Sequence, residues 1–128
     1  MNKEHTEKMS YIVDKLSRLK SVDSIFLFGS SVNGNVREDS DIDIAVLVKK
    51  GTSRADELRI IGYGSDIFDI SIFHRLPLII QFRVLKEGRV LFCRDKKTIC
   101  DVKVDVFRRY LDFSYFINGF YRRVLKNV

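Results

Sequence analysis

The chain has 128 residues, of which 45% are hydrophobic and 31% are charged, and its formal net charge is +6. This length and balance predict one folded domain over residues 1–128, and they are not those of a disordered chain. Basic residues are spread along the whole sequence rather than gathered in one run, so we do not expect nucleic acid to be a partner.

The distribution of apolar residues also predicts where in the cell the protein is found. No apolar run approaches the roughly 20 residues of a membrane-spanning helix, and the polar start lacks a signal-peptide core. We therefore expect a cytoplasmic protein with no membrane partner. The two cysteines, Cys93 and Cys100, match the spacing of neither a zinc clip nor a redox pair, so we expect buried thiols.

The first half of the sequence predicts a helix and two strands. Apolar residues between positions 9 and 19 recur every three or four residues, which is typical of an amphipathic helix. The apolar run at 25–28, ended by Gly29-Ser30, favours a buried strand. Strict alternation over 42–48 predicts a second strand, whose β-branched residues lie on one face while Asp41 and Asp43 lie on the other.

The second half predicts two further strands and three helices. We expect two helical turns at 55–61, a strand at 67–73, a helix at 78–87 stopped by Gly88, and a short edge strand at 90–92. Apolar residues then repeat from 99 to 124 with helical spacing, which predicts one long C-terminal helix. The sum is a small mixed sheet of about four strands flanked by helices, of the α/β (α+β) class.

The long last helix carries more aromatic residues than one buried stripe requires. The additional ones are Tyr110, Tyr115, Phe116 and Tyr121. We expect most of them to pack against the sheet. The alternative is that some meet a partner or a second copy of the chain, so a homo-oligomer stays open.

Two carboxylates one residue apart carry the strongest chemical signal. Because side chains alternate along a strand, Asp41 and Asp43 share one face at a separation of about 7 Å. Ionised carboxylates at that distance repel each other unless a cation lies between them, and Mg²⁺ prefers such oxygen ligands. Asp69, on the third predicted strand, can supply a third carboxylate, and Asp66 is its rival for that role.

Gly29-Ser30 closes the first strand and opens a polar turn. A glycine there lets backbone N–H groups approach a phosphate, and the hydroxyl adds a donor. Taken alone, a Gly-Ser pair is usually an ordinary turn and an Asp-x-Asp is usually a turn or a helix cap. Their order on consecutive predicted strands makes the combination more specific than either part.

Gly29-Ser30, ten residues, and then Asp41-Ile42-Asp43 resemble the signature of the DNA-polymerase-β-like nucleotidyltransferases. Within that superfamily, Leu76-Pro77-Leu78 and the stretch at 84–92 look like the minimal nucleotidyltransferases, or MNT proteins. These are the antitoxins of type VII pairs with HEPN-domain toxins. The resemblance runs from residue 25 to the final helix.

The resemblance implies a polymerase-β-like fold and an enzyme that transfers AMP from ATP to a tyrosine of a HEPN toxin. It implies that Asp41 and Asp43 bind two Mg²⁺ ions, that Asp69 completes the metal site and helps to activate the attacking hydroxyl, and that Gly29-Ser30 hold the triphosphate. Family members often carry Ala-Arg-Gly after the Gly-Ser pair, whereas this chain has Val32-Asn33-Gly34. Arg37 is the candidate to replace the missing arginine.

Two other functions fit the same residues. A nucleotidyltransferase acting on a small molecule or RNA would use the same three carboxylates, although such enzymes usually have an additional substrate domain. A non-catalytic module that binds a toxin would keep the fold and would not need the arginine.

Overall fold

The computed structural model describes residues 3–29 and 41–126. Its elements, in chain order, are α1 (Lys3–Ser17), β1 (Val22–Phe28), β2 (Ile42–Val48), α2 (Arg54–Ile61), β3 (Phe68–Ile72), the short 3-10 helix η2 (Phe73–Arg75), α3 (Leu78–Glu87), β4 (Arg89–Cys93) and α4 (Lys96–Lys126). The predicted order of elements is confirmed. The first helix and the first strand are longer than predicted, since α1 starts six residues earlier than residue 9 and β1 includes Val22-Asp23-Ser24.

The four strands form one mixed sheet in the order β3-β2-β1-β4. β1 runs antiparallel to both β2 and β4, and β2 runs parallel to β3. The predicted edge position of β4 is therefore confirmed. The fold class and the count of about four strands are confirmed as well.

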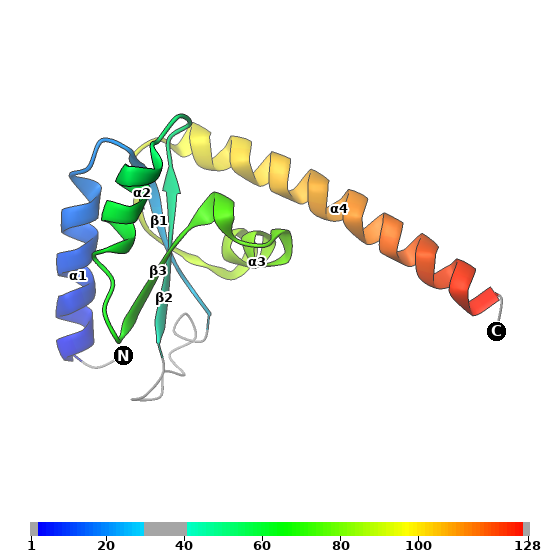
Figure 1. Cartoon of the computed structure of the whole chain (residues 1–128), viewed down its shortest axis with the longest axis horizontal. Helices are drawn as coiled ribbons and strands as arrows, with labels where there is room; N and C mark the ends of the chain where they lie inside the picture. The colour runs from blue at the N-terminus through cyan, green and yellow to red at the C-terminus, as the bar shows by residue number, and fades with distance from the viewer. Residues whose placement is uncertain (1–2, 30–40, 127–128) are drawn as a thin grey trace.

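Helices cover both faces of the sheet, and each face has its own apolar cluster. Figure 1 shows α1 and α2 on one side and α3 and α4 on the other. The first cluster joins Ile12 and Leu16 of α1 to the β-branched face of β2. The second joins Phe26 of β1 and the residues Ala45 and Leu47 of β2 to α3 and α4. Because side chains along a strand alternate between the two faces of the sheet, Asp43 lies on the same face as Ala45 and Leu47.

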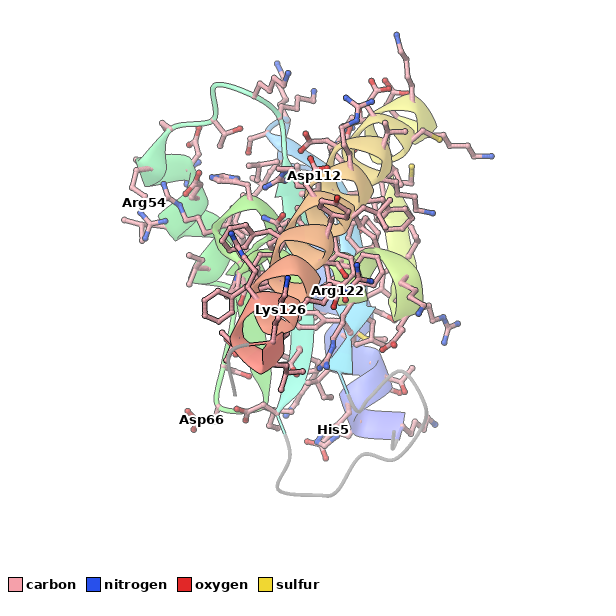
Figure 2. All side chains as sticks on the ribbon, turned by 90° about the vertical axis from the view of Figure 1, so that its right-hand side faces the viewer. His5, Arg54, Asp66, Asp112, Arg122 and Lys126 are labelled. Carbon is pink, nitrogen blue, oxygen red and sulfur yellow. The ribbon has the colours of Figure 1, made fainter. Side chains whose placement is uncertain are left out.

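The long helix α4 packs against the body of the protein only along its first half. The ring of Tyr110 stacks on Phe82 of α3 with centroids 3.9 Å apart, and Phe107 meets the same ring edge-on at 5.2 Å. Beyond Tyr110 the helix projects away from the sheet, as Figure 1 shows; in Figure 2 this part of the helix points toward the viewer. Tyr115, Phe116 and Tyr121 are exposed there. The expectation that most of these aromatics pack against the sheet is therefore wrong, because the helix outruns the surface that could cover them.

Two smaller findings concern expectations from composition. Cys93 is half-buried and Cys100 is exposed, so the expectation of two buried thiols is wrong; Cys100 falls on the solvent side of α4. None of the helices in the described part of the chain has both the length and the apolar character needed to cross a membrane.

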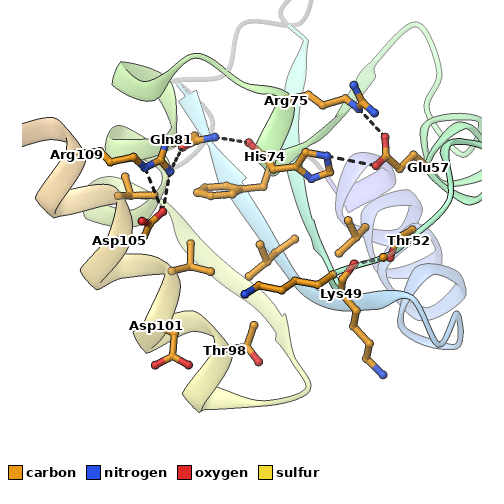
Figure 3. Close-up of a pocket in the computed structure, with 17 residues that line it drawn as sticks. Lys49, Thr52, Glu57, His74, Arg75, Gln81, Thr98, Asp101, Asp105 and Arg109 are labelled. Atoms are coloured by element: carbon orange, nitrogen blue, oxygen red, sulfur yellow. Dashed lines mark hydrogen bonds and ion pairs between the residues drawn. The ribbon is translucent and has the colours of Figure 1, made fainter. Parts of the chain in front are cut away.

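A buried carboxylate holds α2 to the segment that follows β3. Glu57 is only 2% exposed, and its Oε1 accepts hydrogen bonds from Arg54 at 2.9 Å and Arg75 at 2.6 Å. His74 Nε2 lies 3.3 Å from Oε2. These partners cover the carboxylate while their own outer halves remain in water (Figure 3). The hydrogen bond from Arg75 lowers the pKa of Glu57 below its ordinary value, against the opposing effect of burial.

Replacing Glu57 by glutamine should lower the free energy of unfolding by about 1–3 kcal/mol at neutral pH, because the cationic partners lose their counter-ion. A lowered pKa in the folded state means that this stabilisation is present above the ordinary glutamate pKa of about 4.3 and is lost as the pH falls through the folded-state pKa. The difference between wild type and Glu57→Gln should therefore shrink on acidification. Urea unfolding at a series of pH values measures it.

The matched control is Glu4→Gln, which removes an exposed carboxylate paired with Lys8 at 3.1 Å. That change should stay within about 0.5 kcal/mol of wild type, since exposed pairs contribute little. If Glu57→Gln and Glu4→Gln lowered the free energy of unfolding equally, the buried position of Glu57 would not matter for stability, contrary to this prediction.

Candidate active site

Asp41, Asp43 and Asp69 meet at one end of the sheet. Asp43 is the second residue of β2, and Asp69, the second residue of β3, is its register partner on the parallel neighbouring strand. Adjacent strands lie about 4.8 Å apart, and residues at the same level of a parallel pair point to the same face. Asp41 precedes β2 by one residue, so alternation gives it that face too. The three predicted carboxylates are therefore brought together.

The electrostatics of Asp43 reflect this crowding. Partial burial raises the pKa of Asp43 above its ordinary value, and the negative charges of Asp69 and then Asp41 raise it further. Asp41 is exposed, and so is Asp69. It stands on the outer strand of the sheet, where water solvates its charge.

Between the two rival third carboxylates, the geometry favours Asp69. Asp66 is exposed in the loop before β3, and Figure 2 shows it at the lower edge of the molecule. Asp69, by contrast, is in register with Asp43 and acts on its pKa.

Gly29 lies at the end of β1 with a φ of +78°, in the left-handed region that favours glycine. A Cβ built on it would lie 2.6 Å from Oδ2 of Asp43. The preceding residue, Phe28, pairs with Asp43 across the antiparallel β1–β2 ladder. Glycine is thus required twice here, for its backbone conformation and for the close approach of a carboxylate. Ser30 and Arg37, the other predicted nucleotide contacts, lie outside the described residues.

Phe28 is a neighbour that the sequence analysis did not single out. It is half-buried and flanks Asp43 on the side opposite Asp69. An aromatic ring beside a carboxylate contributes to its desolvation. The available signal was its position as the last residue of the strand before Gly29.

The donor chemistry of the three carboxylates fits a hard divalent cation. Their oxygens are of the type that Mg²⁺ prefers, and a cation would relieve the repulsion that raises the pKa of Asp43. Within residues 3–29 and 41–126, no three Asp, Glu, His or Cys side chains are grouped so that they could hold a metal ion by themselves. The carboxylates are neighbours, and ligands from the substrate would have to complete the coordination, as is common for Mg²⁺.

The repulsion at Asp43 has a consequence for stability. A pKa raised in the folded state means that the ionised form of Asp43 opposes folding at neutral pH. We expect Asp43→Asn to raise the melting temperature in the presence of a chelator, although it removes a candidate ligand. Added Mg²⁺ should raise the melting temperature of the wild type and have much less effect on the variant. Differential scanning fluorimetry of both proteins, with Asp66→Asn as control, measures this, and a lower melting temperature for Asp43→Asn in chelator would contradict it.

A cleft lies away from the three carboxylates. It has a volume of about 680 Å³ and is lined by residues at the far end of β2, by the segment after β3 and by the first half of α4. Three of its polar side chains are linked: Gln81 donates to the carbonyl of Phe73 and accepts from Arg109, which also pairs with Asp105 (Figure 3). The cleft is thus at the opposite end of the strand from Asp41 and Asp43, and it is not the carboxylate site.

Sequence comparison assigns this arrangement to a class of enzyme. Residues 10–97 match the family described as "Polymerase beta, Nucleotidyltransferase". Because that match covers more than half of the chain, the protein belongs to the polymerase β nucleotidyltransferase family. The fold is that of a nucleotidyltransferase.

Individual relatives extend this result. A Methanocaldococcus jannaschii protein named "Putative protein adenylyltransferase MJ1547" is 35% identical over 74 residues, a match that spans 58% of each chain. Among solved structures, a chain of a toxin–antitoxin complex with AMP-PNP superimposes with a TM-score of 0.71 at 18% identity, covering 93% of this chain and 97% of that one. A chain from a complex of tri-AMPylated Shewanella oneidensis HEPN toxin with MNT antitoxin gives 0.66 at 17% identity, covering 98% and 99%. These structural likenesses establish the shared fold.

Proposed function

We propose that this protein is the antitoxin of a HEPN/MNT pair and transfers AMP from ATP to a tyrosine of its partner toxin. The observation that carries the proposal is the placement of Asp43 and Asp69 in register beside Gly29, at an open end of the sheet. The relative named as a protein adenylyltransferase and the nearly full-length likeness to chains of toxin–antitoxin complexes support a protein acceptor.

Each residue has a definite part in the proposed reaction. Asp41 and Asp43 would hold two Mg²⁺ ions, and these ions would supply stabilisation of the charge on the attacking and leaving oxygens. Gly29, with Ser30, offers backbone N–H groups to the triphosphate, and Arg37 contributes a positive charge. Asp69 completes the metal site and accepts the proton of the tyrosine hydroxyl. The tyrosine oxygen bonds to the α-phosphorus as the bond to the β-phosphate oxygen breaks, and pyrophosphate leaves.

The test uses the protein encoded by the adjacent gene, if that gene encodes a HEPN-domain protein. Purified chain, α-labelled ATP, Mg²⁺ and this protein are incubated together, and the label should appear on a tyrosine of the partner. A chelator should abolish transfer, and so should replacing the labelled tyrosine of the partner by phenylalanine.

Two other outcomes would overturn the proposal. Label that appears on RNA or on a small molecule and never on protein would indicate a different acceptor. No heat of ATP binding in calorimetry, up to millimolar nucleotide with Mg²⁺, would indicate a non-catalytic binding module.

A further inference from the structure

The projecting half of α4 exposes an unusual amount of apolar surface. Its exposed apolar side chains are Leu111, Phe113, Tyr115, Phe116, Phe120, Tyr121, Val124 and Leu125. A fully exposed aromatic residue offers about 200 Å², and the five aromatics are between 42% and 84% exposed, so together they offer roughly 600 Å². The largest apolar patch of a typical monomer is about 300–600 Å², and a standard interface buries about 800 Å² per partner. The surface thus has the size of an interface.

One stripe of this surface continues the seam that is buried nearer the sheet. Val106 is buried in the core, and from there apolar residues follow at alternating four- and three-residue steps: Tyr110, Phe113, Ile117, Phe120 and Val124. This spacing is the seven-residue repeat by which helices pack side by side. The first part of the seam meets α3, and the second part projects past it (Figure 1).

Apolar residues also occupy the opposite side of the projecting half. At 100° per residue, Leu111 and Tyr115 lie across the helix from Phe113 and Phe120, and Tyr115 is 84% exposed. A helix that carries exposed apolar residues on two opposite sides needs apolar cover on both of them. A second copy of α4 would cover one stripe only, so a single paired helix does not account for this surface.

The charge of the projecting half is predominantly positive. Residues 111–126 contain three basic residues, Arg122, Arg123 and Lys126, and one acidic residue, Asp112. Figure 2 shows Arg122 and Lys126 along this part of the helix. Two copies brought together would add like charges, whereas acidic residues on a different protein would complement them.

We propose that the projecting half of α4 inserts into an apolar groove with an acidic rim on the partner protein. The groove encloses both the stripe and the opposite side of the helix, as in other complexes of an amphipathic helix with a groove. α4 leaves the sheet on the face that bears Asp43 and Asp69, so a protein held there lies on the same side as the carboxylates. The identity of this partner as the acceptor rests on the proposed function.

The test measures binding of the HEPN-domain protein from the adjacent gene by calorimetry without ATP. A stripe variant, Phe113→Ser/Phe120→Ser, and an opposite-side variant, Leu111→Ser/Tyr115→Ser, should each weaken the affinity at least about 100-fold. The matched control, Tyr11→Ser/Leu58→Ser, removes exposed apolar side chains elsewhere and should change it less than about threefold. Arg122→Glu/Arg123→Glu should weaken binding by about tenfold, and this effect should fade at high ionic strength. Circular dichroism verifies that every variant is folded.

Three results would overturn the proposal: wild-type affinity in both α4 variants, loss in the stripe variant alone, or a dimer in sedimentation of the isolated chain that the stripe variant abolishes. The last would identify a second copy as the occupant.

An Asp41→Asn/Asp43→Asn variant should bind the partner as wild type does. AMP transfer with unaffected binding in the α4 variants would refute the docking surface and leave the function intact, whereas α4-dependent binding without transfer would refute the function alone.

Discussion

The Asp41→Asn/Asp43→Asn double variant should lose AMP transfer by at least about 10³-fold while it remains folded. Both side chains lie at the start of β2 and neither belongs to the apolar core, so the substitutions should leave the core packing intact. Asparagine keeps the shape and removes the negative charge that a divalent cation requires. The rate of label transfer to the partner, measured with saturating ATP and Mg²⁺, reports the loss.

The matched control for this variant is Asp66→Asn, which neutralises an exposed carboxylate in the loop before β3. It should retain transfer within about twofold of wild type, as is usual for surface positions. Asp69→Asn should fall with the double variant, because its carboxylate neighbours Asp43 across the parallel pair. Full activity of the double variant would contradict the assignment of the active site.

Replacement of Gly29 by alanine should damage both stability and activity. The methyl group would lie 2.6 Å from Oδ2 of Asp43, on a residue whose φ of +78° already disfavours side chains. We expect the free energy of unfolding to fall by about 2–3 kcal/mol, from backbone strain and from the displaced carboxylate. Transfer should fall at least about 100-fold, because small displacements of positioned groups are costly in catalysis. Chemical unfolding and the labelled-ATP assay measure the two effects.

Gly51 provides the comparison for this change, since it also has a positive φ, of +84°, but no neighbour within 4 Å of a built Cβ. Gly51→Ala should lose about 1 kcal/mol from the backbone alone and keep its activity. A Gly29→Ala protein as active as Gly51→Ala would show that the approach of Gly29 to Asp43 is not needed for the reaction.

The sequence by itself determined the elements and the class of the site. Alternation over 42–48 was enough to put Asp41 and Asp43 on one face of a strand, because strand geometry leaves no other choice for residues two apart. Helical spacing, the glycine at position 88 and the turn residues determined where most helices and strands occur. The resemblance of Gly29-Ser30 and Asp41-Ile42-Asp43 to the signature of the polymerase-β-like nucleotidyltransferases implied nucleotidyl transfer. These are local signals, carried by neighbouring residues.

The tertiary structure decided what depends on neighbours distant in sequence. Only the parallel pairing of β2 and β3 shows that Asp69, not Asp66, stands level with Asp43, because register is set by the packing of the whole sheet. The pairing of β1 with β2 brings Gly29 against Asp43. The aromatics of α4 face solvent because the helix is longer than the surface of the sheet and α3 that could cover it. The periodic pattern of apolar residues is the same whether a helix packs on its own sheet or on a partner, so the sequence could not distinguish the two. Periodicity shows that a face is to be buried, and the tertiary structure shows whether this chain buries it.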